Sequence, residues 1–124
     1  MKIPVILLAS ALAIAAPPAY TADKADFNVR TTRDLVNLCS VQSGDDMYEA
    51  AMGFCLGFLD AAHDYHAAIT SGDMVKPIAC PGYQTTRQEY VDMFQAWART
   101  NDALLDNESP IQGVMRAASA KWPC

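Results

Sequence analysis

The sequence predicts an all-α fold, a small four-helix bundle stapled by two disulfides. Apolar side chains recur at spacings of three and four residues in several segments, which is the period of a helix with one buried face. Three of these segments follow a serine or threonine of the kind that caps a helix start. No segment alternates apolar and polar residues over the length of a strand. A chain of 124 residues has room for one such domain.

Residues 1–22 have the three zones of a secretion signal. Lys2 supplies a positive start, a nearly continuous apolar run follows, and the stretch up to Ala22 is small, proline-bearing and polar. Cleavage near Ala19 or Ala22 fits this pattern. The apolar run is shorter than the roughly 20 residues of a spanning helix, so we expect an exported domain, residues 23–124, without a membrane span.

The charge of the exported domain argues against nucleic acid as a partner. Removal of the signal takes away one of the 9 basic residues, which leaves 8 against 14 acidic residues and a net charge of about −6. Nucleic-acid binding depends on cations that neutralise phosphates. A basic protein partner would be attracted instead, although such a charge also keeps a domain soluble.

The first part of the domain predicts a loose tail followed by two helices. Residues 23–28 form the tail, and Thr31 or Thr32 can cap a short helix that ends near Ser40. A turn then precedes the longest periodic segment, about residues 45–70, which predicts one long amphipathic helix. The apolar positions of this helix are Met47, Ala51, Phe54, Phe58, Ala61, Tyr65 and Ala68.

The second part of the domain predicts two further helices with a loop before each. Residues 71–85 contain prolines and glycines and form the main loop. Thr86 makes a capping box with the glutamate three positions later and starts a helix that runs to about Arg99. Ser109, followed by proline and then by glutamine at the third position, starts the last helix, which Pro123 ends.

One stripe of the long helix has almost no side chains, because Gly53, Gly57 and Ala61 lie four residues apart. Glycine inside a helix costs about 1 kcal/mol relative to alanine, which indicates that another backbone comes close to these glycines. We expect this neighbour in the same chain, because the two glycines flank Cys55. A partner subunit is the alternative.

Four cysteines in an exported chain indicate two disulfides rather than reactive thiols. In an up-and-down bundle Cys39 lies near the turn between the first two helices, whereas Cys80 and Cys124 both lie toward the opposite end. We therefore expect Cys39 to pair with Cys55, and Cys80 with Cys124. Pairing of Cys55 with Cys80 stays open, because the loop after the long helix could fold back along it.

The residues that could act as metal ligands or as catalytic groups have simpler explanations. Asp60, His63, Asp64 and His66 gather on the long helix and could hold a metal, but their spacing is not that of a zinc protease helix and an exposed polar face explains them. A cysteine nucleophile needs a free thiol, and the serines at helix ends serve as caps or turns. The sequence thus predicts no metal, no cofactor and no enzyme active site.

Four motifs occur in order along nearly all of the exported domain. They are Leu38-Cys39, then Gly53-Phe54-Cys55-Leu56-Gly57-Phe58, then Cys80-Pro81 with Gln88 and Val91 after it, and the terminal Trp122-Pro123-Cys124. In this order and spacing they resemble the Rap/Tai family of immunity proteins.

The resemblance implies a function. Characterised members of that family are small helical periplasmic proteins that neutralise peptidoglycan amidase toxins delivered by type VI secretion. They form dimers and inhibit sterically, through a surface loop that enters the catalytic groove of the toxin. The resemblance therefore implies a periplasmic immunity protein with a cognate amidase effector as its partner, a homodimer, and no catalysis of its own.

The family pattern assigns no contact residues, so we infer the binding surface from charge. We expect the acidic connection that bears Asp102, Asp106 and Glu108 to contact the partner, because exposed acids can pair with basic groups around a groove. A solvated turn explains the same acids. The loop around Cys80 is the second candidate, because a disulfide would preorganise it.

A second class of function stays open beside toxin binding. The same disulfide scaffold could serve a periplasmic structural or chaperone-like helical module that has no toxin partner. A neighbouring gene for a small secreted amidase would distinguish the two.

Overall fold

The structure is a computed structural model that describes residues 20–124, so most of the expected signal, residues 1–19, lies outside the described part. Its four α-helices are α1 (Thr32–Cys39), α2 (Tyr48–Ile69), α3 (Arg87–Thr100) and α4 (Pro110–Lys121). Two short 3-10 helices, η1 (Lys24–Phe27) and η2 (Asp102–Leu104), precede α1 and α4. No strand occurs in the described residues, and the all-α prediction is confirmed.

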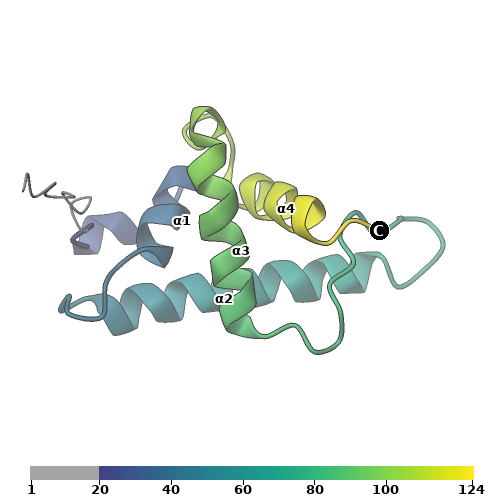
Figure 1. Ribbon diagram of the computed structural model, residues 1–124, viewed down its shortest axis with the longest axis horizontal. Coiled ribbons are helices and arrows are strands. Elements are labelled where there is room, and N and C mark those ends of the chain that lie inside the picture. Colours follow the sequence, from purple (N-terminus) through teal and green to yellow (C-terminus); the bar gives the residue numbers. More distant parts are fainter. Residues whose placement is uncertain (1–19) are drawn as a thin grey trace, which may run out of the picture.

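The helix α2 is the longest element, and the other three helices all contact it. It runs along the long axis of the molecule, α3 crosses it, and α1 and α4 lie above it in Figure 1. The main loop leaves the end of α2, extends beyond it and returns past the carboxyl terminus before α3 begins (Figure 1). Within residues 20–124 no helix has the length and apolar character of a membrane span.

Three of the predicted helix starts are confirmed in atomic detail. The Oγ1 of Thr31 accepts the amide of Asp34 at 3.2 Å, and the Asp34 carboxylate accepts the amide of Thr31 at 2.9 Å. Thr86 and Glu89 form the same reciprocal pair at the start of α3. These bonds satisfy amides that have no partner inside the helix. At α4 the amide of Ser109 donates to the Oε1 of Gln112 at 2.9 Å.

The start of α2 lies later than the sequence indicates, at Tyr48 instead of about residue 45. Asp45 organises a turn before the helix: its side chain accepts the amide of Met47 at 2.7 Å, and its carbonyl accepts the amide of Tyr48 at 3.0 Å. Its second carboxylate oxygen accepts the amide of Ala22 at 3.2 Å. The turn therefore also ties down the amino-terminal segment.

The prediction of a loose tail at residues 23–28 is wrong. Asp23 caps η1 by accepting the amide of Ala25 at 2.7 Å, and Asp26 accepts the amide of Asp23 at the same distance. The ring of Phe27 then packs edge-on against Phe54 of α2, with 6.0 Å between the centroids. Such a contact between distant segments leaves no periodic signal in the sequence.

The core has two parts. The larger cluster lies among the four helices and centres on Phe94, Leu35, Leu59, Val91 and Val114, which are all almost completely buried. The smaller cluster lies at the amino-terminal end and is formed by Ala22, Leu38, Val41 and Ala51.

Both predicted disulfides are confirmed, and the alternative pairing of Cys55 with Cys80 is wrong. The bridge from Cys39 to Cys55 joins α1 to α2, and the bridge from Cys80 to Cys124 joins the main loop to the carboxyl terminus. They close loops of 16 and 44 residues. Chain-entropy arguments assign about 3 and about 4 kcal/mol to such bridges. Both values are large for a domain of this size.

The expected close approach to Gly53 and Gly57 within the chain is wrong. Both glycines are exposed, and a Cβ added to either would meet no atom within 4 Å. The close approach occurs at Gly113 of α4, where an added Cβ would lie 2.9 Å from the Cβ of Thr32. Thr32 is buried, and its hydroxyl donates to the carbonyl of Ser109 at 2.8 Å. This contact sets how closely α1 and α4 pack.

We expect Gly113→Ala to destabilise the protein, because the added methyl group overlaps with Thr32 and forces α1 and α4 apart. Overpacking of this kind costs about 1 to 3 kcal/mol. Chemical denaturation monitored by circular dichroism measures the change. Gly82→Ala is the matched control, since a Cβ there meets no atom within 4 Å. Equal stability of the two variants would contradict the packing role of Gly113.

Candidate functional site

The acidic connection between α3 and α4 is docked onto the start of α1. The amide of Arg33 donates to the carbonyl of Leu105 at 2.9 Å, and Leu105 is buried. The Arg33 guanidinium then contacts Asp102 at 3.1 Å and Asp106 at 2.7 Å. Two of the three predicted contact acids are therefore brought together on one arginine, although both carboxylates remain largely exposed.

The contact between Arg33 and Asp106 stabilises the charged forms of both side chains. The hydrogen bond from Arg33 lowers the pKa of Asp106, and the same bond raises the pKa of Arg33. Arg33 and Asp106 are thus both charged at neutral pH. One positive charge against two carboxylates leaves a small negative excess, so this surface is less acidic than its sequence indicates.

Glu108 differs from the expectation of an exposed acid. Its side chain is only 11% exposed and its Oε1 contacts the Nε of Arg116 in α4 at 2.7 Å. Its other oxygen, Oε2, is buried and has no hydrogen-bond partner among the described residues. Glu108 therefore faces inward and contributes to the packing of the connection.

The polar side chains of α2 that could bind a metal do not point to one common site. Asp60 contacts the Nε of Arg87 at 2.8 Å, and the Nδ1 of His63 is 2.9 Å from the hydroxyl of Tyr90. The Nε2 of His66 accepts the amide of Ile78 at 3.2 Å. Each of these side chains contacts a different neighbour. Across residues 20–124, no three His, Cys, Asp or Glu side chains are grouped as metal ligands would be.

Exposed apolar side chains gather at the carboxyl-terminal end of α2 and on the loop that follows it. Of seven large apolar residues that are exposed in the described chain, six lie there. They are Tyr65, Ile69, Met74, Val75, Ile78 and Tyr83. Met74 is 98% exposed, and Tyr83 is fully exposed. We call this set the apolar loop surface. Apolar surface concentrated in this way is typical of protein interaction sites.

Four contacts hold the main loop in place. The disulfide joins Cys80 to the carboxyl terminus, and the amide of Cys80 donates to the carbonyl of Trp122 at 2.8 Å. The adjacent Ala79 is buried in the main core cluster. The bond from Ile78 to His66 ties the loop back to α2. A loop held in this way loses little entropy on binding.

Sequence reasoning named the loop around Cys80 only as a second candidate and did not identify its apolar residues. Met74, Val75 and Ile78 lie between turn residues, and their apolar character in a segment without helical period was the available signal. Their exposure depends on where Cys124 and the end of α2 lie. The sequence could not show that.

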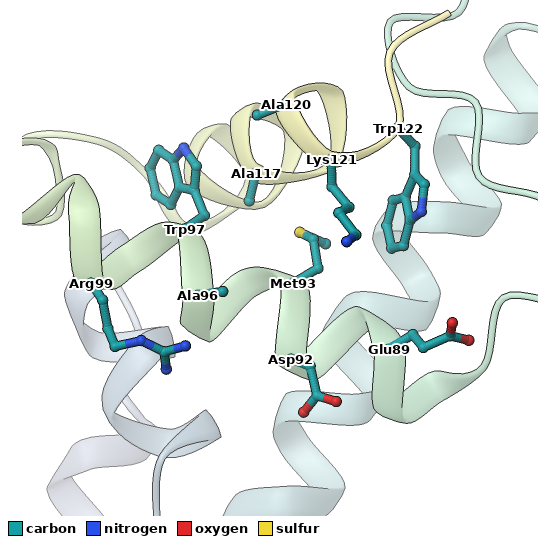
Figure 2. A pocket seen from close by; sticks show the side chains of 10 residues that line it. All are labelled: Glu89, Asp92, Met93, Ala96, Trp97, Arg99, Ala117, Ala120, Lys121 and Trp122. Atoms are coloured by element: carbon teal, nitrogen blue, oxygen red, sulfur yellow. The ribbon is translucent and has the colours of Figure 1, made fainter.

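A groove of about 560 Å³ lies between α3 and α4. Figure 2 shows Trp97 at one end and Trp122 at the other, with Ala96 and Ala117 between them. The nearby carboxylate of Glu89 serves the cap of α3, and the amide of Thr86 lowers its pKa. The lining also contains the charged residues Asp92 and Lys121, and it contains no serine, cysteine or histidine.

Comparison with known proteins agrees with the resemblance found in the sequence. Residues 31–124 match the model of the Rap1a immunity proteins, a segment that begins at the cap of α1 and includes both disulfides. Neither the search of curated proteins nor the search of solved structures finds a match. Because the family model covers most of the chain, the protein belongs to the Rap1a immunity protein family.

Proposed function

We propose that this protein binds a toxic effector and blocks it sterically, without catalysis of its own. Family membership supports an effector-immunity role. The partner that we propose is a peptidoglycan amidase delivered by type VI secretion, which acts where its substrate lies, in the periplasm. The two disulfides suit that oxidising compartment.

The observation that carries the binding role is the apolar loop surface. Large apolar side chains are costly to leave in water, and six of the seven that are exposed in the described residues lie in the carboxyl-terminal part of α2 and the loop that follows it. Tyrosine is enriched among the residues that dominate binding energy, and methionine adapts to irregular surfaces. The disulfide at Cys80 holds the loop in shape. This surface can therefore insert into a groove of a partner at a low entropic cost.

The acidic connection is the weaker candidate for the contact surface. Arg33 already pairs with Asp102 and Asp106, and Glu108 faces inward. A partner would gain little from acids whose charge the domain itself largely balances. We therefore place the main contact on the apolar loop surface and leave Asp102 and Asp106 a peripheral role in attracting a basic partner.

A structural or chaperone-like module with no toxin partner would use an exposed apolar surface differently. Binding of many clients favours flexible surfaces that repack. Here the loop is tied by a disulfide, by the amide of Cys80 and by His66. A surface held in one shape favours a single cognate partner.

We expect Met74→Ser combined with Tyr83→Ser to weaken the complex with a cognate amidase by about 10-fold or more, since each removes an exposed apolar anchor. Calorimetry with amidase effectors from the same source measures the affinity, and peptidoglycan hydrolysis measures the inhibition. Ile111→Ser is the matched control, because Ile111 is exposed on α4, outside the apolar loop surface.

Two outcomes would count against this assignment. If Asp102→Asn with Asp106→Asn weakens binding and the loop variant does not, the acidic connection is the contact surface. If no amidase binds the unaltered domain, the immunity function itself is contradicted.

We propose that signal cleavage follows Ala19 and not Ala22. Ala22 is 7% exposed and its amide donates to Asp45, so it belongs to the folded domain. Tyr20 packs against the same cluster, and its burial together with a hydrogen bond to Asp26 raises its pKa to about 12. The mature protein should begin at Tyr20, which intact-mass analysis of periplasmic material measures. A mature form that begins at Asp23 would contradict this boundary.

We also propose a homodimer in which a second copy covers the stripe of Gly53, Gly57 and Ala61. This stripe is exposed and carries no long side chain, so another helix could approach it closely. Sedimentation should give twice the monomer mass. Gly57→Leu should give a folded monomer, because within the chain a Cβ there meets no atom. An unaltered chain that sediments as a monomer at all concentrations would contradict the dimer.

A further inference from the structure

We propose that His66 is a pH-sensitive positioning residue that holds the main loop against α2 and releases it on protonation. The hydrogen bond between the Ile78 amide and His66, which we call the clamp, is a property of the free domain. Its consequence for the partner, that acidification loosens the contact surface, rests on the function proposed above. The loop and the end of α2 lie side by side at the same end of the molecule (Figure 1).

The geometry of the clamp depends on the protonation state of one nitrogen. The amide of Ile78 donates to the Nε2 of His66 at 3.2 Å. Only a ring nitrogen without a proton can accept this bond. Among the described residues, this is the only hydrogen bond that a backbone amide of residues 72–79 donates to another part of the structure. Protonation of His66 therefore removes a contact that no neighbouring amide replaces.

The backbone below His66 is itself well fixed. Its carbonyl accepts the amide of Thr70 at 3.1 Å and the hydroxyl of Thr70 at 2.8 Å, which closes the last turn of α2. The His66 ring borders a small apolar cavity that Ala79 and Pro81 of the loop also line. The histidine is thus positioned by the helix end, and the loop packs against it.

A protonated His66 finds no compensating partner in this cavity. The other titratable groups that line it are His63 of the same helix and Tyr90 of α3. These two already contact each other at 2.9 Å, and burial raises the pKa of Tyr90, so the phenol stays neutral. The residues that α4 contributes are Val114, Met115 and Ala118, which carry no charge.

The charged groups on the loop and the helix lie outside this cavity. Asp73 and Lys76 are exposed on the loop. On α2, Asp60 is paired with Arg87, and Asp64 is exposed. A new positive charge on His66 would therefore face the Ile78 amide, which is also a donor, and no carboxylate is among the residues that line the cavity. Histidine titrates within the range of about pH 5 to 8, which an exported protein can meet.

Release would affect part of the loop only. Cys80 stays bound to Cys124 and to the carbonyl of Trp122, and neither contact titrates in this range. The segment between Thr70 and Cys80, which carries Met74, Val75 and Ile78, would lose its link to α2. Acidification is thus expected to loosen half of the apolar loop surface while the fold persists.

Amide exchange measured by NMR on the free domain tests the clamp. The protection factor of the Ile78 amide, corrected for intrinsic exchange, should fall about 2- to 10-fold between pH 7.5 and pH 5.0, the equivalent of one hydrogen bond. In His66→Gln the side-chain oxygen can accept the same amide at both pH values, so protection should persist. In His66→Leu protection should be low at both.

His63→Gln is the matched control, because it removes the neighbouring histidine and leaves the clamp in place. Its Ile78 amide should respond to pH as in the unaltered domain. The proposal is overturned if Ile78 protection in the unaltered domain is independent of pH, or if His66→Gln shows the same response. Since no partner is present, failure of toxin binding leaves this result unchanged.

Discussion

The Cys80–Cys124 disulfide is the constraint on which the shape of the main loop, and so of the proposed contact surface, depends. The segment between α2 and α3 has no regular structure and carries large apolar side chains. Without a tether such a segment would collapse or fluctuate, because few of its amides are bonded. The bridge joins it to the carboxyl terminus, and the amide of Cys80 and the buried Ala79 extend this anchor. A loop thus becomes a surface of defined shape.

The acidic connection illustrates how charge that looks functional can be structural. Arg33 collects Asp102 and Asp106 because the backbone of α1 is already hydrogen-bonded to Leu105. Glu108 turns inward to Arg116. These pairs dock the connection onto α1 and α4. In the function proposed above, recognition then depends on the exposed apolar groups of the main loop, which suits steric inhibition better than electrostatic capture.

Local sequence signals predicted the elements with short-range causes. Capping at Thr31 and Thr86 depends on residues three positions apart, so the sequence contained all the required information. Features with long-range causes were missed. The spacing of Gly53 and Gly57 predicted a close contact on α2, but the close contact in the structure is between Thr32 of α1 and Gly113 of α4. A glycine indicates that space is needed and does not say which neighbour needs it.

The sequence by itself determined the helical class, the starts of three helices and the family, because these follow from periodicity, capping and motif order, and it ranked the cysteine pairings without deciding between them. Only the tertiary structure decided which polar and apolar groups are free to meet a partner. Exposure depends on how distant segments pack: Ala22 is buried in one cluster with Leu38, whereas Met74 of the main loop is left in solvent. The proposed contact surface therefore depends on packing between distant segments, whereas the helices that support it depend on local sequence signals.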